Sequence, residues 1–88
     1  MEFEWDGGKA ADNLTKHDVS FADAARFEFE AALTVLDTRL AYPEPRWRSI
    51  GYIGARLHVI VFTYRGNKVR VISLRKANSR EVQSYELR

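Results

Sequence analysis

Three long runs in the second half of the chain alternate apolar and polar positions. They cover residues 47–53, 56–65 and 68–75. Alternation with a period of two is typical of half-buried β-strands. Gly54-Ala55 and Gly66-Asn67 separate these runs, and two-residue connections of this kind are typical of β-hairpins. The pattern therefore predicts three consecutive antiparallel strands.

The N-terminal part of the chain predicts two helices. Asp6 suits the N-cap of a helix over residues 7–17, where apolar positions recur at helical spacing. Ser20, with Asp23 three residues later, suits the start of a second helix over residues 21–30.

The remaining stretches complete the predicted domain. Two further strands and a proline-marked loop are expected at residues 2–5, 31–38 and 39–45. Asn78 followed by Glu81 resembles a capping box and predicts a last helix over 79–86. Together these elements predict a single small α+β domain over residues 1–88, because a chain of this length has room for only one core.

The two-residue turns also fix which side chains share a face of the sheet. One face then carries a basic group with Thr63 at its centre, and its members are Arg46, Arg48, Arg65, Lys68 and Arg70. The opposite face carries Trp47, Phe62 and Val71 and is suited to covering by helices. Like charges side by side destabilise a sheet unless something offsets them, and arginine forks suit phosphate oxygens. The alternative is a solvated surface neutralised by Asp and Glu of the first half.

In this register His58 falls beside Arg75 on the core-side face, where a lone histidine is more often structural than catalytic. No set of His, Asp and Glu has a zinc-site spacing, and the chain has no cysteine. The glycines do not form a phosphate-binding loop, and no hydrolase triad motif is present. We therefore expect neither a metal nor a cofactor.

The charge distribution is asymmetric, although the net charge is only +2. Residues 1–44 carry four basic and ten acidic residues, whereas residues 45–88 carry ten basic and two acidic ones. A basic half suits a polyanion or an acidic protein partner. The longest apolar run, residues 59–62, is too short to span a membrane, and the acidic N-terminus is unlike a signal peptide, so a cytoplasmic location is expected.

Both ends of the chain carry a longer pattern. The front contains Trp5-Asp6, Lys9, Asn13, Lys16-His17, Ser20-Phe21 and Ala24. The middle and end contain Arg46, Gly51, Arg65, Arg70, Ile72-Ser73, Arg75-Lys76-Ala77, Arg80-Glu81 and Tyr85. With these motifs the chain resembles the BrnT family, the ribonuclease toxins of bacterial type II toxin–antitoxin pairs. It departs from the family pattern at Gly7, Pro45 and Leu74, and because of Pro45 no role is assigned to Glu44.

The resemblance implies a RelE-like fold, with two N-terminal helices and a C-terminal helix packed on a mostly antiparallel sheet. It implies a metal-independent RNA endonuclease that inhibits translation and growth. It also implies a hetero-oligomer with a BrnA-like antitoxin, whose ribbon-helix-helix part binds operator DNA.

Cleavage by attack of the ribose 2′-OH needs a base, an acid and cations at the phosphate. Arg46 and Arg70 are the first candidates for phosphate stabilisation. Further candidates for phosphate binding are Arg48, Arg65, Lys68, Arg75 and Lys76. The other catalytic candidates are Glu81, Tyr85, Lys9 and His17, each with a structural alternative such as helix capping or core packing.

Two other functions use the same basic face. A non-catalytic partner protein would hold an acidic protein segment or nucleic acid there. A decayed toxin is a further alternative because of the Pro45 departure.

Overall fold

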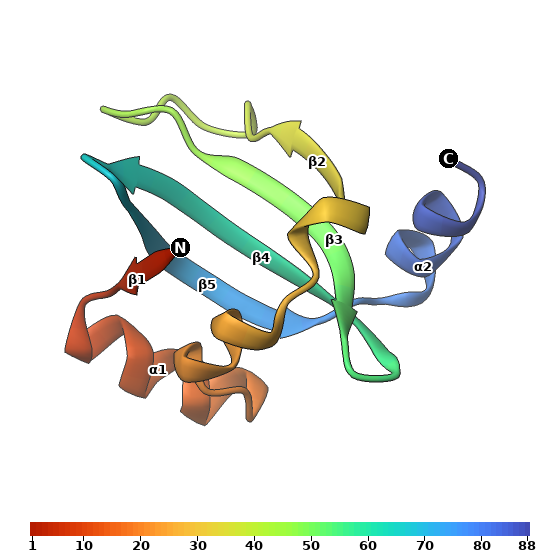
Figure 1. The fold of residues 1–88 in the computed structure, drawn as a ribbon, viewed down its shortest axis with the longest axis horizontal. Coiled ribbons are helices and arrows are strands. Elements are labelled where there is room, and N and C mark those ends of the chain that lie inside the picture. The colour runs from red at the N-terminus through yellow and green to blue at the C-terminus, as the bar shows by residue number, and fades with distance from the viewer.

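The computed structural model describes residues 1–88 and contains one five-stranded sheet with helical segments on both faces (Figure 1). The strand order is β1-β5-β4-β3-β2. The strands are β1 (Glu2–Glu4), β2 (Leu33–Leu36), β3 (Trp47–Ile53), β4 (Arg56–Arg65) and β5 (Lys68–Lys76). β1 lies parallel to β5, and the other neighbouring strands are antiparallel. The predicted α+β class is therefore confirmed, with a mixed sheet.

Two tight hairpins set the register of β3, β4 and β5. Gly54 and Gly66 begin the turns with φ angles of 59° and 61°, which glycine adopts without the steric cost of a side chain. Trp47 pairs with Phe62, and Phe62 pairs with Val71, as the two-residue turns predict. The predicted core-side face is therefore present at this end of the sheet.

A β-bulge changes the register further along β5. Val61 pairs with Ser73, whereas an uninterrupted ladder would pair it with Ile72. The extra residue in β5 moves every later side chain of this strand to the other face of the sheet.

The prediction that His58 lies beside Arg75 is therefore wrong. His58 pairs with Lys76, and Arg75 pairs with Val59 on the face opposite the main core. His58 is buried, and its Nδ1 lies 2.9 Å from the carbonyl oxygen of Arg56, in a structural position.

Two of the three predicted helices are present. α1 (Gly7–His17) begins after Asp6, whose carboxylate accepts a hydrogen bond from the backbone N–H of Lys9 at 2.9 Å. α2 (Ser79–Glu86) begins after Asn78, as predicted. α1 and α2 lie against opposite faces of the sheet.

The predicted second helix over residues 21–30 is wrong. The chain instead forms two short 3₁₀ turns, η1 (Phe21–Arg26) and η2 (Phe29–Ala31). Between them Phe27 is extended, with φ −71° and ψ 130°. This break brings the rings of Phe27 and Phe29 within 4.7 Å of each other in the core, whereas residues two apart on an α-helix do not face each other.

Gly51 in β3 makes room for this aromatic group. A Cβ atom at Gly51 would lie 2.8 Å from Cζ of Phe27 and 3.0 Å from Cβ of Ala32. Such distances are too short for carbon atoms in contact, so the close approach of η2 to β3 requires glycine here.

The side chain of Asn13 completes the edge of β5 beyond the end of β1, where no strand pairs with it. Its Nδ2 donates hydrogen bonds to the carbonyl oxygens of Leu74 and Val19, at 2.7 and 3.0 Å. Its Oδ1 accepts a hydrogen bond from the backbone N–H of Leu74 at 3.1 Å. A neighbouring strand would offer the same donor and acceptor, so Asn13 has a structural role.

The two faces of the sheet are covered to different extents. The main core, which includes Phe21, Ile60 and Leu74, lies between one face and α1, η1 and η2. A smaller core around Ile50 and Val59 lies between α2 and one end of the other face. Figure 1 shows α2 beyond this end, and the rest of that face carries no helix.

Candidate functional site

Four arginines lie on the face of the sheet that α2 covers only in part. Arg48 is opposite Val61, Arg70 is opposite Thr63, and the bulge brings Arg75 to the same face. Arg46 precedes β3 and continues the side of Arg48 by one pleat. We call this group of Arg46, Arg48, Arg70 and Arg75 the arginine face.

Arg46 and Arg48 have no anionic partner. The Nε group of each is buried and makes no hydrogen bond, and neither side chain takes part in an ion pair. The guanidinium carbon of Arg46 lies 4.2 Å from the centre of the Tyr42 ring, which fixes the cation without neutralising it. No carboxylate neutralises either guanidinium, so both keep their positive charge and are suited to binding an added anion.

The Tyr42 ring belongs to a loop that an ion pair holds in place. The carboxylate of Asp37 is 1% exposed and accepts two hydrogen bonds from the Arg39 guanidinium, both at 2.8 Å. The hydroxyl of Tyr42 donates to the same carboxylate at 3.4 Å. The bonds from Arg39 lower the pKa of Asp37 to about 2, although burial acts in the opposite direction. The loop that contacts Arg46 is therefore fixed by charge.

Arg70 is paired with a residue that the sequence did not indicate as part of a site. Glu4 in β1 stands opposite Arg70 in the parallel ladder, and its Oε2 accepts a hydrogen bond from Nη1 at 2.7 Å. The Glu4 side chain remains 31% exposed. The alternation at residues 2–5 predicts that Glu4 shares a side with Glu2, but it does not reveal the pairing with β5.

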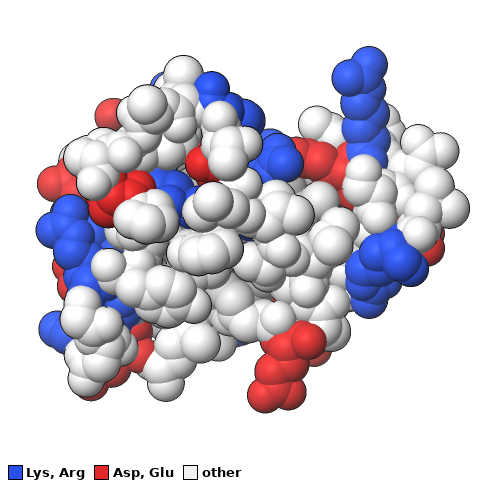
Figure 2. Space-filling model, turned by 90° about the horizontal axis from the view of Figure 1, so that it is seen from above, with Lys and Arg blue, Asp and Glu red and all other residues white.

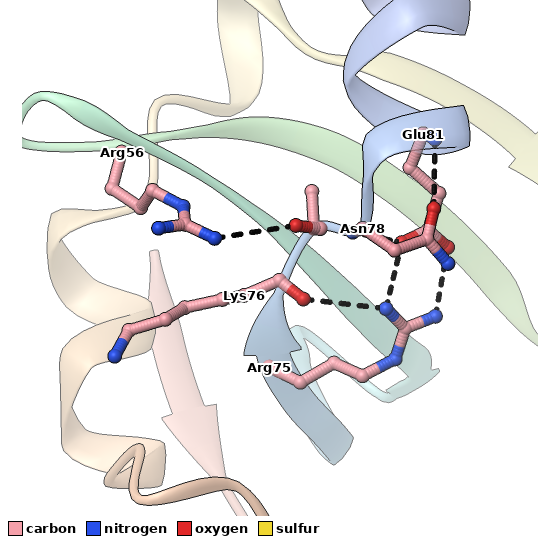
Figure 3. A network of polar contacts seen from close by, with 6 residues as sticks. Arg56, Arg75, Lys76, Asn78 and Glu81 are labelled. Carbon is pink, nitrogen blue, oxygen red and sulfur yellow. Dashed lines mark hydrogen bonds and ion pairs between the residues drawn. The ribbon is translucent and has the colours of Figure 1, made fainter.

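Arg75 makes two hydrogen bonds to a carboxylate, whereas Arg70 makes one (Figure 3). Its guanidinium donates two hydrogen bonds to the Glu81 carboxylate, at 2.7 and 2.8 Å. Glu81 also accepts from the backbone N–H of Asn78 at 2.9 Å, while the Asn78 side chain accepts from that of Glu81 at 2.9 Å. This is the predicted capping box, and it orients Arg75 as well.

Charge reinforces this arrangement. The hydrogen bonds from Arg75 lower the pKa of Glu81, and the positive charge of Arg48 contributes in the same direction. The same hydrogen bonds raise the pKa of Arg75. Glu81 therefore remains an anion whose two oxygens are already bonded, which suits a positioning role better than that of a base.

Several predicted site residues lie elsewhere. Tyr85 is buried in the smaller core, and its hydroxyl donates to the carbonyl oxygen of Ala31 at 3.0 Å. Lys9 and His17 are exposed on α1, which packs against the opposite face of the sheet. The structure therefore does not bring these three side chains to the arginine face.

The other basic candidates lie at the two ends of the β4–β5 hairpin. Arg65 and Lys68 pair with each other at the tip and are exposed. Lys76 is exposed on the side opposite the arginine face, because it follows the bulge and pairs with His58. Arg65 and Lys68 can extend a basic surface beyond the arginine face, whereas Lys76 is placed away from it.

No group of three or more His, Cys, Asp or Glu side chains is arranged to hold a metal ion. None of the helices has the length and apolar character needed to cross a membrane.

Comparisons with known proteins identify the family of this chain and support its fold. The family model for the ribonuclease toxin BrnT of type II toxin–antitoxin systems matches residues 5–81. Among solved structures, the chain is similar to the crystal structure of the Brucella abortus ribonuclease toxin BrnT. The TM-score is 0.69 and the sequence identity 28%, over 90% of this chain and 99% of that chain. The curated proteins contain no match. Since the family match spans most of the chain and every residue of the arginine face, the chain belongs to the BrnT family of ribonuclease toxins of type II toxin–antitoxin systems.

Proposed function

We propose that this chain is an RNA endonuclease that inhibits translation and growth, and that the arginine face binds the phosphate at the cleavage site. Membership of the family supports ribonuclease activity. The observation that supports this location is the pair Arg46 and Arg48, which lie on the arginine face and have no carboxylate partner. A phosphate offers oxygens in the geometry that an arginine fork binds best.

In the proposed reaction the ribose 2′-oxygen forms a bond to the adjacent phosphorus. The bond from phosphorus to the 5′-oxygen of the next nucleotide breaks, giving a 2′,3′-cyclic phosphate and a 5′-hydroxyl. The base takes the 2′-OH proton, and the leaving oxygen gains a proton from an acid or from water. Negative charge grows on the phosphoryl oxygens, where the cations Arg46, Arg48 and Arg75 stabilise it.

Glu4 is placed best to act as the base. Its Oε2 is bound to Arg70, its Oε1 has no hydrogen-bond partner, and its side chain is partly exposed. Glu81, by contrast, uses both oxygens to hold Arg75 and Asn78. We therefore assign proton transfer to Glu4 and positioning of Arg75 to Glu81.

We also propose that the reaction needs no metal ion. The arginine face already provides fixed positive charge for the phosphate, and no cluster of metal-ligating side chains accompanies it. Cleavage should therefore continue when divalent ions are chelated.

A type II toxin has an antitoxin partner, and this holds for the chain as a family member. We propose that this partner is BrnA-like, with a ribbon-helix-helix part that brings the complex to operator DNA. The toxin would then contact DNA only through its antitoxin.

Cleavage of a labelled RNA oligonucleotide by the purified chain, with EDTA present, tests these assignments. The wild type should yield a cyclic phosphate end, and Arg46→Ala should slow cleavage by roughly 10²–10³-fold because one charge-stabilising donor is lost. Arg26→Ala is the matched control, since Arg26 is exposed on η1 and makes no ion pair.

Each part of the proposal can fail separately. Equal rates for Arg46→Ala and Arg26→Ala would contradict the location of the site. Cleavage that stops in EDTA and returns with magnesium would contradict metal independence.

A further inference from the structure

A recess adjoins the arginine face between β2, β3 and α2. It has an empty volume of about 640 Å³, part of which is open to solvent. Three apolar side chains, Leu33, Val35 and Ile50, contribute one part of its lining. The polar part consists of Arg48, Arg80, Glu81 and Ser84. A mixture of apolar walls and a few convergent polar groups is typical of a ligand site.

The strand register explains why the recess is apolar on one side. Leu33 pairs with Ile50, which in turn pairs with Val59 on the same face of the sheet. These aliphatic side chains form a surface against which a flat ring can lie. Base pockets of proteins combine contacts of apolar side chains with the ring and hydrogen bonds at its edge.

The recess and the proposed phosphate site share a residue. Arg48 lies on the arginine face and also lines the recess. Successive same-side positions of a strand are about 7 Å apart, so Arg46, Arg48 and Ile50 mark two such steps from the phosphate site into the recess. One nucleotide can therefore place its phosphate on the arginines and its base in the recess.

The polar groups of the recess differ in whether they donate or accept hydrogen bonds. Arg75 and Asn78 hold the Glu81 carboxylate, which can only accept hydrogen bonds. Its Oε1 already accepts from both residues, and its Oε2, which accepts once from Arg75, can accept one more. Arg48 and Arg80 can only donate, and neither takes part in an ion pair. Guanine alone offers a pair of acceptors, O6 and N7, beside a pair of donors, N1–H and the N2 amino group. Adenine would turn the lone pair of N1 toward the carboxylate.

We infer that this recess is a guanine-binding subsite that directs cleavage to RNA with guanine next to the cleaved phosphate. The arginines contact O6 and N7, Oε2 of Glu81 accepts one hydrogen bond from N1–H, and the aliphatic side chains contact the ring. The inference rests on the proposed ribonuclease function and adds a base preference to it.

Cleavage of four oligonucleotide sets tests this inference. Each oligonucleotide is DNA except for one ribonucleotide, which confines cleavage to one bond, and the bases on either side of that bond are varied in turn. The wild type should cleave a guanine-containing set roughly 10- to 100-fold faster than the others, as expected for loss of a good bidentate base contact.

A bulky residue in the recess provides the second comparison. Ser84→Trp should fill the recess and remove the preference for guanine while cleavage of all sets continues. Gln83→Trp is the matched control, because Gln83 is the preceding exposed residue of α2 and does not line the recess. Its guanine preference should remain that of the wild type.

The outcomes separate the inference from the function on which it rests. Equal cleavage of all sets by the wild type, or a guanine preference that persists in Ser84→Trp, would overturn the guanine subsite alone. Absence of cleavage with every set would overturn the ribonuclease proposal, and the subsite with it.

Discussion

The four arginines of the arginine face differ in the side chains with which they interact. Arg46 rests on an aromatic ring, Arg70 and Arg75 are each bonded to a carboxylate, and Arg48 has neither kind of partner. A carboxylate partner fixes an arginine but uses part of its capacity to bind an anion. Arg46 and Arg48 are therefore the arginines best suited to bind a phosphate. Arg70 and Arg75, which carboxylates hold in place, can orient the bound phosphate.

At the residue scale, the most specific prediction concerns Glu4. Glu4→Gln keeps a carbonyl oxygen that can accept from Arg70 but cannot take up the 2′-OH proton. Cleavage should slow by roughly 10²–10⁴-fold, the usual range for loss of a general base. Binding of an uncleavable RNA analogue, in which the reacting 2′-OH is replaced by hydrogen, should stay close to that of the wild type.

Glu2→Gln is the control for this change, because Glu2 lies on the same strand, is exposed and pairs with Lys68. If Glu4→Gln and Glu2→Gln cleave RNA at similar rates, Glu4 is not the base.

The ion pair between Asp37 and Arg39 in the Tyr42 loop should make the free energy of unfolding depend on pH. Asp37 has a lowered pKa of about 2, so its ion pair stabilises the fold fully above the usual carboxylate pKa of 3.8 and less as the pH falls toward 2. Asp37→Asn should reduce the free energy of unfolding by roughly 1–2 kcal/mol at pH 6. Urea unfolding at a series of pH values should show this difference shrinking toward zero near pH 2, and a difference that does not depend on pH would contradict the account.

At the scale of elements, the bulge in β5 decides the composition of the site. Hairpin turns can be recognised from Gly54 and Gly66, and they correctly predict the pairing as far as Phe62. The bulge carries no comparable pattern in the sequence, since Ile72 and Ser73 suit a regular strand equally well. It nevertheless moves Arg75 onto the arginine face, where Glu81 can hold it.

Pairings between segments far apart in the chain could not be predicted from the sequence either. The parallel pairing of β1 with β5 places Glu4 opposite Arg70, although 66 positions separate them. Nothing local in either segment specifies that partner. The helix caps at Asp6 and Asn78 depend only on neighbouring residues, which is why both could be predicted.

The hydrogen bonds between the Asn13 side chain and the edge of β5 should contribute to the stability of the fold. Asn13→Ala would leave the backbone N–H and carbonyl of Leu74 without partners in a buried place. The free energy of unfolding should fall by about 2–3 kcal/mol, measured by urea unfolding at neutral pH. Asp12→Ala, an exposed neighbour on α1, should change it by less than about 0.5 kcal/mol. Equal effects of the two changes would show that Asn13 is not needed at this edge.

For the whole molecule, the charge asymmetry of the two halves is only partly neutralised by folding. Only one of the three ion pairs, Glu4 with Arg70, joins the acidic first half to the basic second half. The other two pairs each lie within one half of the chain. The fold therefore leaves most basic side chains of the second half without an acidic partner from the first half, although Figure 2 shows acidic and basic side chains on the same side of the molecule.

The most direct test of this account is growth and RNA integrity after induction of the chain alone in a bacterium. Wild type, Arg46→Ala and Arg26→Ala should be compared at equal soluble levels. We expect growth arrest and RNA breakage with wild type and Arg26→Ala, and neither with Arg46→Ala. Normal growth and intact RNA with soluble wild type, or equal toxicity of Arg46→Ala, would contradict RNA cleavage at the arginine face.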